Sequence, residues 1–208
     1  YLLLGQLVGG GMGMPRFEAA EVGNLELTWL IPLSLIGTIC GWLYFVSEHA
    51  SEALAHAIGE RPVVKAMLAG LALAICGTVL PYTMFAGETQ ADVLMETYLT
   101  IPAGVLIATG LVKAMLTPAL INLGWRGGHF FPVIFSGVSL GYGLAILTGA
   151  DPVFCVAVCT ASTMGAVMRQ PVMVVGLLLM CFPLKGIVCM IIAAVIAAGI
   201  PLPKPLRK

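Results

Sequence analysis

The residues best suited to bind a small anion lie together in the stretch GWRGGHFFP at positions 124–132. Gly127 and Gly128 would let the chain turn sharply and approach a ligand closely, because glycine has no Cβ atom. Pro132 suits the first turn of a helix, where its missing N–H group costs nothing. We therefore expect a new helix to begin near His129.

The first backbone amides of such a helix are donors for an anion. The N–H groups of His129, Phe130 and Phe131 would have no acceptor within the helix, and the helix dipole adds partial positive charge at the same end. If this end lies inside the membrane, partial charges would hold a dehydrated anion weakly enough to release it. Arg126, at the mouth, would either raise the local anion concentration or position the loop.

Lys113 is a second candidate, because it places a charge inside an otherwise apolar segment, residues 101–123. Charges within a membrane are costly and commonly serve a function, so Lys113 is a candidate for an ion pathway. Two structural alternatives are equally open. The side chain could extend to the membrane surface, or its ammonium group could bind a cluster of carbonyl oxygens.

A possible metal site lies in the stretch SEHASEALAHAIGE at residues 47–60, where His49, Glu52 and His56 fall on roughly one helix face. Imidazole and carboxylate groups are suitable ligands. The sequence supplies no further cluster of strong ligands. We therefore interpret the stretch as the exposed polar end of a membrane helix, and expect neither a metal nor another cofactor.

The stretch GVSLG at residues 137–141 matches G-x-S-x-G, the pattern around the nucleophile of many serine hydrolases. That nucleophile needs a strand, a sharp turn and a helix around it. Here the pattern lies within a continuous apolar segment, so we expect Gly137 and Gly141 to allow close helix packing. No Asp–His pair accompanies Ser139, and we expect no enzyme activity.

The elements that position these residues are membrane helices. Of the 208 residues, 60% are hydrophobic and 10% charged, and the mean hydropathy is +1.04. Long apolar runs without strand-like alternation predict helices, because lipid offers no partner to exposed backbone groups. The expected fold class is an all-α, polytopic integral membrane bundle. A formal net charge of zero leaves no basic face for nucleic acid.

Several apolar segments are too short to cross a bilayer, which takes about 20 residues. We therefore expect tilted and broken helices, which line pathways in many transporters. Breaks fall at Arg169-Gln170-Pro171 and again around Pro183 and Lys185. The apolar segments lie at about residues 1–14, 29–46, 63–82, 101–123, 130–148, 153–168, 172–184 and 187–200.

The stretches between the apolar segments differ in the sign of their charge. The tail at residues 204–208 is basic, whereas the stretch at residues 88–96 carries Glu88, Asp92 and Glu96. By the positive-inside rule, we expect the tail in the cytoplasm and the acidic stretch as a loop outside. The expected location is the cell (inner) membrane.

At residues 128–132 the sequence resembles the CLC family of chloride channels and chloride/proton exchangers. The letters GHFFP match that family's G-x-F-x-P motif, and residues 124–128 resemble its glycine-rich approach. Lys113 stands where the family often has a basic residue, and Arg169-Gln170-Pro171 resembles its Arg-x-Pro junction. The resemblance covers nearly the whole chain and corresponds to the C-terminal half of a CLC membrane domain, without the N-terminal half.

The resemblance implies one inverted repeat of the CLC fold, in a single transmembrane domain over residues 1–208. It also implies a homodimer in membrane lipid, with an anion path between this half and the missing N-terminal half. Chloride or another small anion would be transported and coordinated by the amides of His129 and Phe130. The alternative is a membrane scaffold that keeps the fold without transport. The implied site residues are Gly128, His129, Phe130, Phe131 and Pro132, with Gly127, Arg126 and Lys113 supporting the pathway.

Some of the family's motifs are absent from residues 1–208. The motif G-S-G-x-P and the segment with the gating glutamate are not found, and GMGMP at residues 11–15 imitates the first without its serine. The family's coordinating Tyr would fall around Leu206 and Arg207, and Met180 stands where many members have Glu. These differences indicate a divergent prokaryotic branch and leave the preferred anion open.

Overall fold

The computed structural model describes residues 15–84, 86–203 and 206, and all regular structure in this part of the chain is helical. The expected all-α fold class is therefore confirmed. Segment 1–14 and most of the basic tail lie outside the described residues. The helices are α2 (Asn24–Ile58), α3 (Pro62–Val79), α4 (Glu88–Thr97), α5 (Ala103–Asn122), α6 (Phe130–Thr148), α7 (Pro152–Met168), α8 (Pro171–Leu178) and α9 (Ile187–Gly199), with 3-10 turns at Pro81–Thr83 and Tyr98–Thr100.

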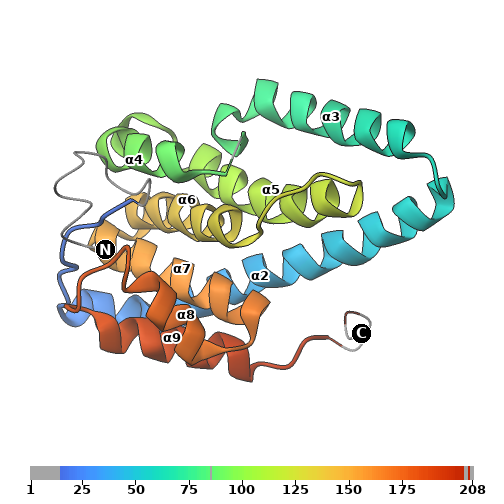
Figure 1. The fold of residues 1–208 in the computed structure, drawn as a ribbon. Coiled ribbons are helices and arrows are strands. Elements are labelled where there is room, and N and C mark those ends of the chain that lie inside the picture. Colours follow the sequence, from blue (N-terminus) through green and yellow to red (C-terminus); the bar gives the residue numbers. More distant parts are fainter. Residues whose placement is uncertain (1–14, 85, 204–205, 207–208) are drawn as a thin grey trace, which may run out of the picture.

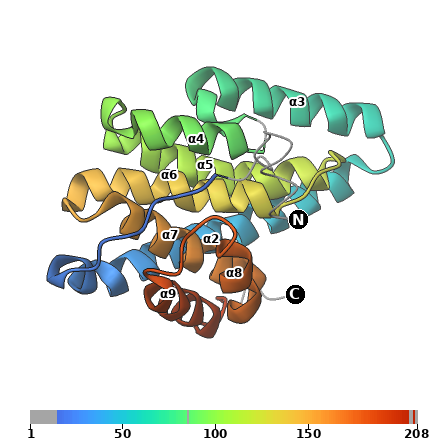
Figure 2. The same cartoon turned by 60° about the vertical axis from the view of Figure 1, so that its left-hand side comes forward.

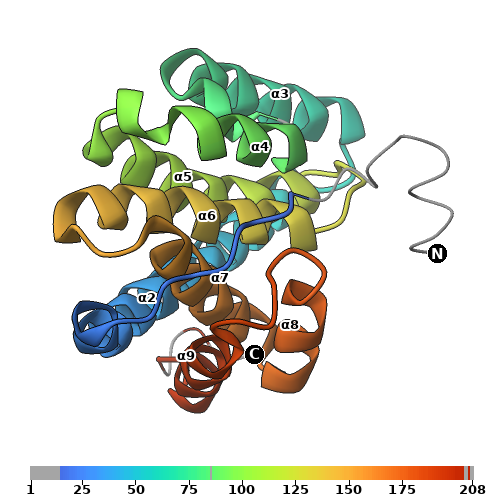
Figure 3. The same cartoon turned by 90° about the vertical axis from the view of Figure 1, so that its left-hand side faces the viewer.

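The helices form layers with α6 and α7 at the centre (Figure 1). Figure 3 looks at the layers from one end: α3 and α4 lie on one side, followed by α5 and α6, then α7 with α2, and finally α9 with α8. Every residue from 133 to 145 in α6 and from 154 to 166 in α7 is buried. The end of α6 that carries the candidate site is thus held by neighbours on both sides.

Four of the described helices are long and apolar enough to cross a membrane: α2, α3, α5 and α6. By contrast, α7 has 17 residues, α9 has 13 and α8 has only 8. The prediction of short, broken helices is confirmed. Only 6% of the apolar window of α3 is buried, so this helix presents nearly its whole surface outward, as a lipid-facing helix does.

Glycines bring the two central helices into close contact. A Cβ atom at Gly137 would lie 2.4 Å from the Cα atom of Thr160, and one at Gly141 would lie 2.5 Å from the Cα atom of Val156. Ser139, between them, donates a hydrogen bond of 2.8 Å to the Leu106 carbonyl of α5. The pattern G-x-S-x-G therefore serves helix packing, as predicted.

The acidic stretch at residues 88–96, whose charged residues are spaced four apart as on a helix, is helical in the structure. It forms α4, which packs on α6 with Ala91 and Leu94 buried. Residues at spacings of three bury a narrow stripe, whereas the acidic side chains occupy the remaining surface. The averaged polarity of the stretch hid this stripe.

Two predicted segments also change their bounds. The polar residues 47–58 form the end of the same helix as residues 29–46, as interpreted from the sequence, which makes α2 a single helix of 35 residues. The expected segment 172–184 is helical only as far as Leu178, and the chain then runs in turns to the start of α9. The break predicted around Pro183 and Lys185 is confirmed.

The junction at Arg169 joins three helices. Arg169 adopts a left-handed conformation, with φ of 57°, at the C-terminal end of α7, and Pro171 begins α8. Its Nη1 atom donates hydrogen bonds to the carbonyl oxygens of Ala198 (2.9 Å) and Ile200 (2.5 Å) at the end of α9. The break predicted at Arg169-Gln170-Pro171 is confirmed.

Candidate anion-binding site

The helix α6 begins where the sequence predicts. His129 is its N-cap residue, Phe130 is its first residue, and Pro132 lies in the first turn. Within the described part of the chain, the amides of residues 129–131 donate no hydrogen bond, whereas the Val133 amide already bonds to the His129 carbonyl at 3.1 Å. This helix end therefore offers three backbone donors and the positive end of a 19-residue helix.

The His129 side chain takes no part in capping this helix. Its ring stacks on the ring of Phe130, with centroids 4.5 Å apart and planes inclined by 24°. The two rings are half-buried. Stacking holds the imidazole against its neighbour and leaves the amide of residue 129 without competition from its own side chain.

The sharp turn before α6 lies at Gly124, not at the two glycines that the sequence analysis favoured. Gly124 has φ of +97°, and its amide bonds to the Ile121 carbonyl at 3.0 Å to close the end of α5. Gly127 and Gly128 are not among the described glycines with positive φ, and a Cβ atom would meet nothing within 4 Å at either one. These two glycines leave an open, exposed approach to the helix end.

Lys113 is buried in α5 and retains only 4% of its exposure. Its Nζ atom donates a hydrogen bond of 2.7 Å to the carbonyl oxygen of Thr83, the last residue of the turn Pro81–Thr83. Of the alternatives considered for Lys113, the structure thus supports binding to a carbonyl oxygen over extension to the membrane surface. The sequence contained no signal for Thr83, because the two residues lie 30 positions apart.

A cavity of about 300 Å³ brings several of the predicted site residues together. Lys113 lines it from α5, the 125–128 loop closes one end, and Pro132 contributes from α6. Residues 129–131 are not among its described lining residues. The cavity therefore lies beside the start of α6, with Gly128 and Pro132 on either side of the free amides in its lining.

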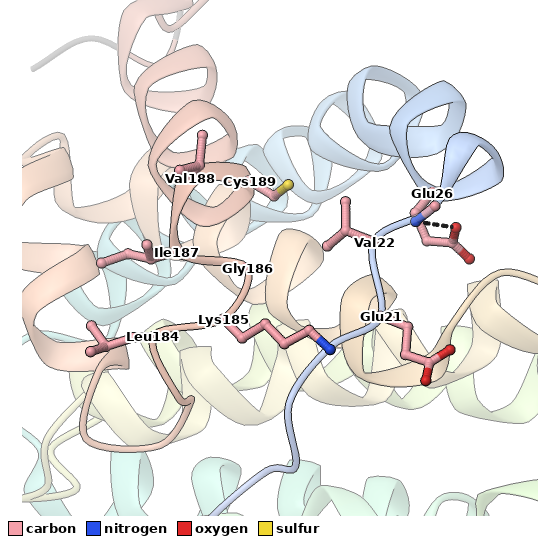
Figure 4. A pocket seen from close by; sticks show the side chains of 10 residues that line it. Glu21, Val22, Glu26, Leu184, Lys185, Gly186, Ile187, Val188 and Cys189 are labelled. Atoms are coloured by element: carbon pink, nitrogen blue, oxygen red, sulfur yellow. Dashed lines mark hydrogen bonds between the residues drawn. The ribbon is translucent and has the colours of Figure 1, made fainter.

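A second cavity, of about 640 Å³, lies at the opposite end of α6 (Figure 4). It opens between the segment before α2 and the turn before α9. Lys185 extends across it toward the non-helical segment that carries Glu21. Glu26 accepts hydrogen bonds from the amides of Gly23 (2.9 Å) and Asp151 (3.1 Å). No sequence motif pointed to this cavity, which lies too far along α6 to serve the free amides.

The stretch around His49 shows no metal-binding arrangement in the described residues. The described residues contain no group of three or more His, Cys, Asp or Glu side chains placed to hold a metal ion. The Nδ1 atom of His49 lies 2.9 Å from the carbonyl oxygen of Phe45, one turn earlier in α2. His49 is therefore bound to its own helix.

Comparison with known proteins identifies relatives of this arrangement. The chain is 28% identical over 145 residues to YfeO proteins of Escherichia coli O7:K1 and Escherichia fergusonii, whose names assign them provisionally to ion transport; the match covers 66% of this chain and 34% of theirs. A crystal structure of a CLC-type fluoride/proton antiporter matches with a TM-score of 0.76 and 21% identity, over 98% of this chain and 52% of that one.

The chain thus spans about a third of the curated relatives and about half of the solved structure. The structural match shows that the described helices have the arrangement of a CLC transporter. The family model for voltage gated chloride channels matches residues 3–201. The apolar helices are therefore those of an integral membrane protein, and the chain belongs to the CLC family.

Proposed function

We propose that this chain is one half of an anion transporter, in which the anion passes the N-terminal end of α6. The observation that supports the proposal is the set of amides at residues 129–131, which donate no hydrogen bond within the described part of the chain. Family membership supports the same function, because CLC proteins transport anions. Residues 1–208 would form one transmembrane domain, and the complementary half would face the exposed 124–128 loop.

The proposed mechanism is electrostatic and involves no covalent step. A partly dehydrated anion accepts hydrogen bonds from the amides of His129 and Phe130, while Phe131 adds a third donor at the same end. Partial charges bind the ion without trapping it, because release must follow binding in each cycle. Exposed Arg126 raises the anion concentration near the loop, and Gly127 and Gly128 leave room for the ion to approach.

Chloride, fluoride or another small anion could be the transported ion, and the site accounts for any of them through the same amides. Proton coupling would depend on carboxylates outside the central helices. No acidic residue occurs within α5, α6 or α7. We propose that any proton-carrying glutamate belongs to the complementary half, and that the assembled protein is a homodimer in lipid.

The proposed orientation places the candidate site toward the cytoplasm. In Figure 1 the loop before α6, the start of α3 and the start of α8 lie at the same end of the molecule. Arg61 and Arg126 belong to these connections, Lys65 lies in the first turn of α3, and Arg169 lies just before α8. The opposite end carries α4 and the start of α2. The positive-inside rule favours the basic end as cytoplasmic.

Flux measurements on the native-length protein in liposomes would test this proposal. Chloride or fluoride efflux is recorded together with proton movement, and protein-free liposomes provide the baseline. Anion efflux above the baseline is expected. Opposing, stoichiometric proton movement would identify an exchanger, and efflux without protons a channel. A correctly folded, dimeric protein that moves neither anion would contradict the proposal and favour a scaffold that keeps the CLC fold.

A further inference from the structure

The cavity shown in Figure 4 lies where two non-helical segments of the chain meet. Residues 15–23, before α2, run beside the turn before α9 (Figure 2), and two contacts hold these segments together. The Phe17 amide donates a hydrogen bond of 2.9 Å to the Cys181 carbonyl, and the ring of Phe17 stacks on that of Phe182 with centroids 4.4 Å apart. All three residues are buried. The two walls of the cavity are therefore held at a fixed separation.

The two walls carry charges of opposite sign. Lys185 enters the cavity from the turn before α9, whereas Glu21 and Glu26 line it from the other side (Figure 4). The side chains of Lys185 and Glu21 form no ion pair or hydrogen bond with any part of the chain that the structure describes. A ligand with both a positive and a negative group could bind both walls at once, and hydrogen bonds between charged groups are the stronger ones.

Each wall also has hydrogen-bonding capacity that the protein leaves unused. Glu26 accepts one bond from the Gly23 amide and one from the Asp151 amide, and because a carboxylate has about four acceptor positions it can also accept from an ammonium group. On the other wall, the amides of Gly186 and Val188 donate no hydrogen bond within the described part of the chain. One wall thus suits a positive group of a ligand and the other a negative group.

The size and position of the cavity suit the headgroup of a lipid. Its volume is about 640 Å³, within the range of about 300–1,000 Å³ that is typical of ligand pockets. It lies at the ends of membrane helices, beside the starts of α2 and α9, and Val22, Leu184 and Ile187 add apolar surface next to the charges. Charged groups beside apolar surface at a helix end match the boundary between lipid headgroups and acyl chains.

We propose that this cavity binds a phosphoethanolamine group, with the phosphate at Lys185 and the ammonium at Glu21 and Glu26. An ammonium group donates three hydrogen bonds, whereas the trimethylated nitrogen of choline donates none and a glycerol headgroup carries no positive charge. The cavity should therefore distinguish phosphatidylethanolamine from phosphatidylcholine and phosphatidylglycerol. This binding is separate from anion transport and does not depend on it.

Binding measurements with three short-chain lipids would test the proposal. The native-length protein is purified in detergent, and native mass spectrometry follows its binding of dihexanoyl phosphatidylethanolamine, phosphatidylcholine and phosphatidylglycerol, whose acyl chains are identical. We expect the ethanolamine lipid to bind about tenfold more tightly than the other two, because hydrogen bonds between charged groups contribute more than neutral ones. Equal affinity for all three lipids would overturn the proposal.

Phosphoethanolamine occurs both in phospholipids and as a free compound, and competition separates these two sources. The free compound is added to the protein that has bound the ethanolamine lipid. Displacement only at far higher concentrations than the lipid would assign the site to the membrane lipid, because the glycerol and acyl chains would then contribute to binding. Displacement at equal concentrations would assign the site to the free compound, with the same two walls as its partners.

Two variants remove one charge each and should differ in their effect on the three lipids. Glu21→Gln removes a partner of the ammonium, so it should weaken binding of the ethanolamine lipid about five- to tenfold and leave the affinity for phosphatidylglycerol unchanged. Lys185→Gln removes the partner of the phosphate and should weaken binding of all three lipids. Both side chains are exposed, so neither change disturbs the core.

Glu18→Gln is the matched control for Glu21→Gln. Glu18 is exposed in the same non-helical segment but is not among the described residues that line the cavity. Removing its charge should therefore leave all three affinities unchanged. Equal losses of affinity for the ethanolamine lipid in Glu18→Gln and Glu21→Gln would show that the general charge of this surface attracts the lipid, and would contradict the proposal.

Discussion

Gly137 and Thr160 bring the backbones of α6 and α7 into direct contact. A Cβ atom at Gly137 would lie 2.4 Å from the Cα atom of Thr160 and 2.9 Å from its amide nitrogen. Neither neighbouring atom belongs to a flexible side chain, so any added methyl group must move one helix. The central pair of helices is therefore sensitive to one carbon atom at this position.

The first prediction follows from this contact. Gly137→Ala should destabilise the protein by about 1–3 kcal/mol, because overpacking forces the backbone to shift. Gly70→Ala in α3 is the matched control, since a Cβ atom there meets nothing within 4 Å. Alanine loses less conformational entropy than glycine when a helix forms, so the control should be more stable than the wild type by about 0.5–1 kcal/mol. Thermal unfolding in detergent measures both, and equal midpoints would contradict the packing argument.

Anion binding should depend on the backbone of residue 130 more than on the side chain of residue 129. Phe130→Pro removes one donor at the first position of α6, where proline is tolerated, and should weaken binding about ten- to a hundredfold. His129→Ala keeps every amide and should have a mild effect. Phe130→Leu removes the ring but keeps the amide, and so separates the two contributions.

Titration calorimetry with chloride and fluoride would measure these affinities, and circular dichroism would check that the helix content is retained. We expect the wild type to have the highest anion affinity. His129→Ala and Phe130→Leu should bind the anion only slightly less tightly, and Phe130→Pro far less tightly. If Phe130→Pro and His129→Ala bind the anion equally well, the helix end is not the site.

Ser139 should matter for stability and not for hydrolysis. Its hydroxyl donates to the Leu106 carbonyl of a neighbouring helix, so Ser139→Ala should cost about 0.5–1.5 kcal/mol. Ser136→Ala is the comparison, because Ser136 bonds only within its own helix, to the Pro132 carbonyl at 2.9 Å. Any esterase activity of the preparation should be the same in all three proteins; a selective loss in Ser139→Ala would revive the hydrolase interpretation.

Thiol labelling tests the proposed orientation. Exposed Arg61 and Asp92 lie at opposite ends of the molecule, before α3 and within α4. In intact cells a membrane-impermeant maleimide should label Asp92→Cys, whereas Arg61→Cys should react only after the membrane is opened. Five of the six native cysteines are buried, which keeps the background low. The reverse pattern would invert the topology.

The start of α6 could be predicted from the sequence because its signals are local. Pro132 and the glycines before it lie within nine residues, and the structure begins the helix one residue after His129. Lys113 was equally visible as an isolated charge. Its partner Thr83 was not, because a backbone carbonyl carries no residue-type signal and the pairing depends on how α5 packs against the preceding turn.

Tertiary context also decides the features that the sequence analysis missed. Gly124 and Gly127 are chemically identical, and only the path of the chain shows that the positive φ falls at Gly124. In α4, burial of Ala91 and Leu94 depends on the apolar face of α6 being close enough to cover them. Glu26 bonds to the amide of Asp151, which is 125 residues away, and no spacing rule connects such distant positions.

The hydrogen bonds from Arg169 to the end of α9 have a consequence for how the protein tolerates changes in pH. They join residue 169 to residues 198 and 200, so that one side chain closes a segment of about thirty residues that contains all of α8. A guanidinium group keeps its charge at every physiological pH, unlike histidine or a carboxylate. Acidification therefore leaves these hydrogen bonds in place, and α7 and α9 keep their relative position as the pH changes.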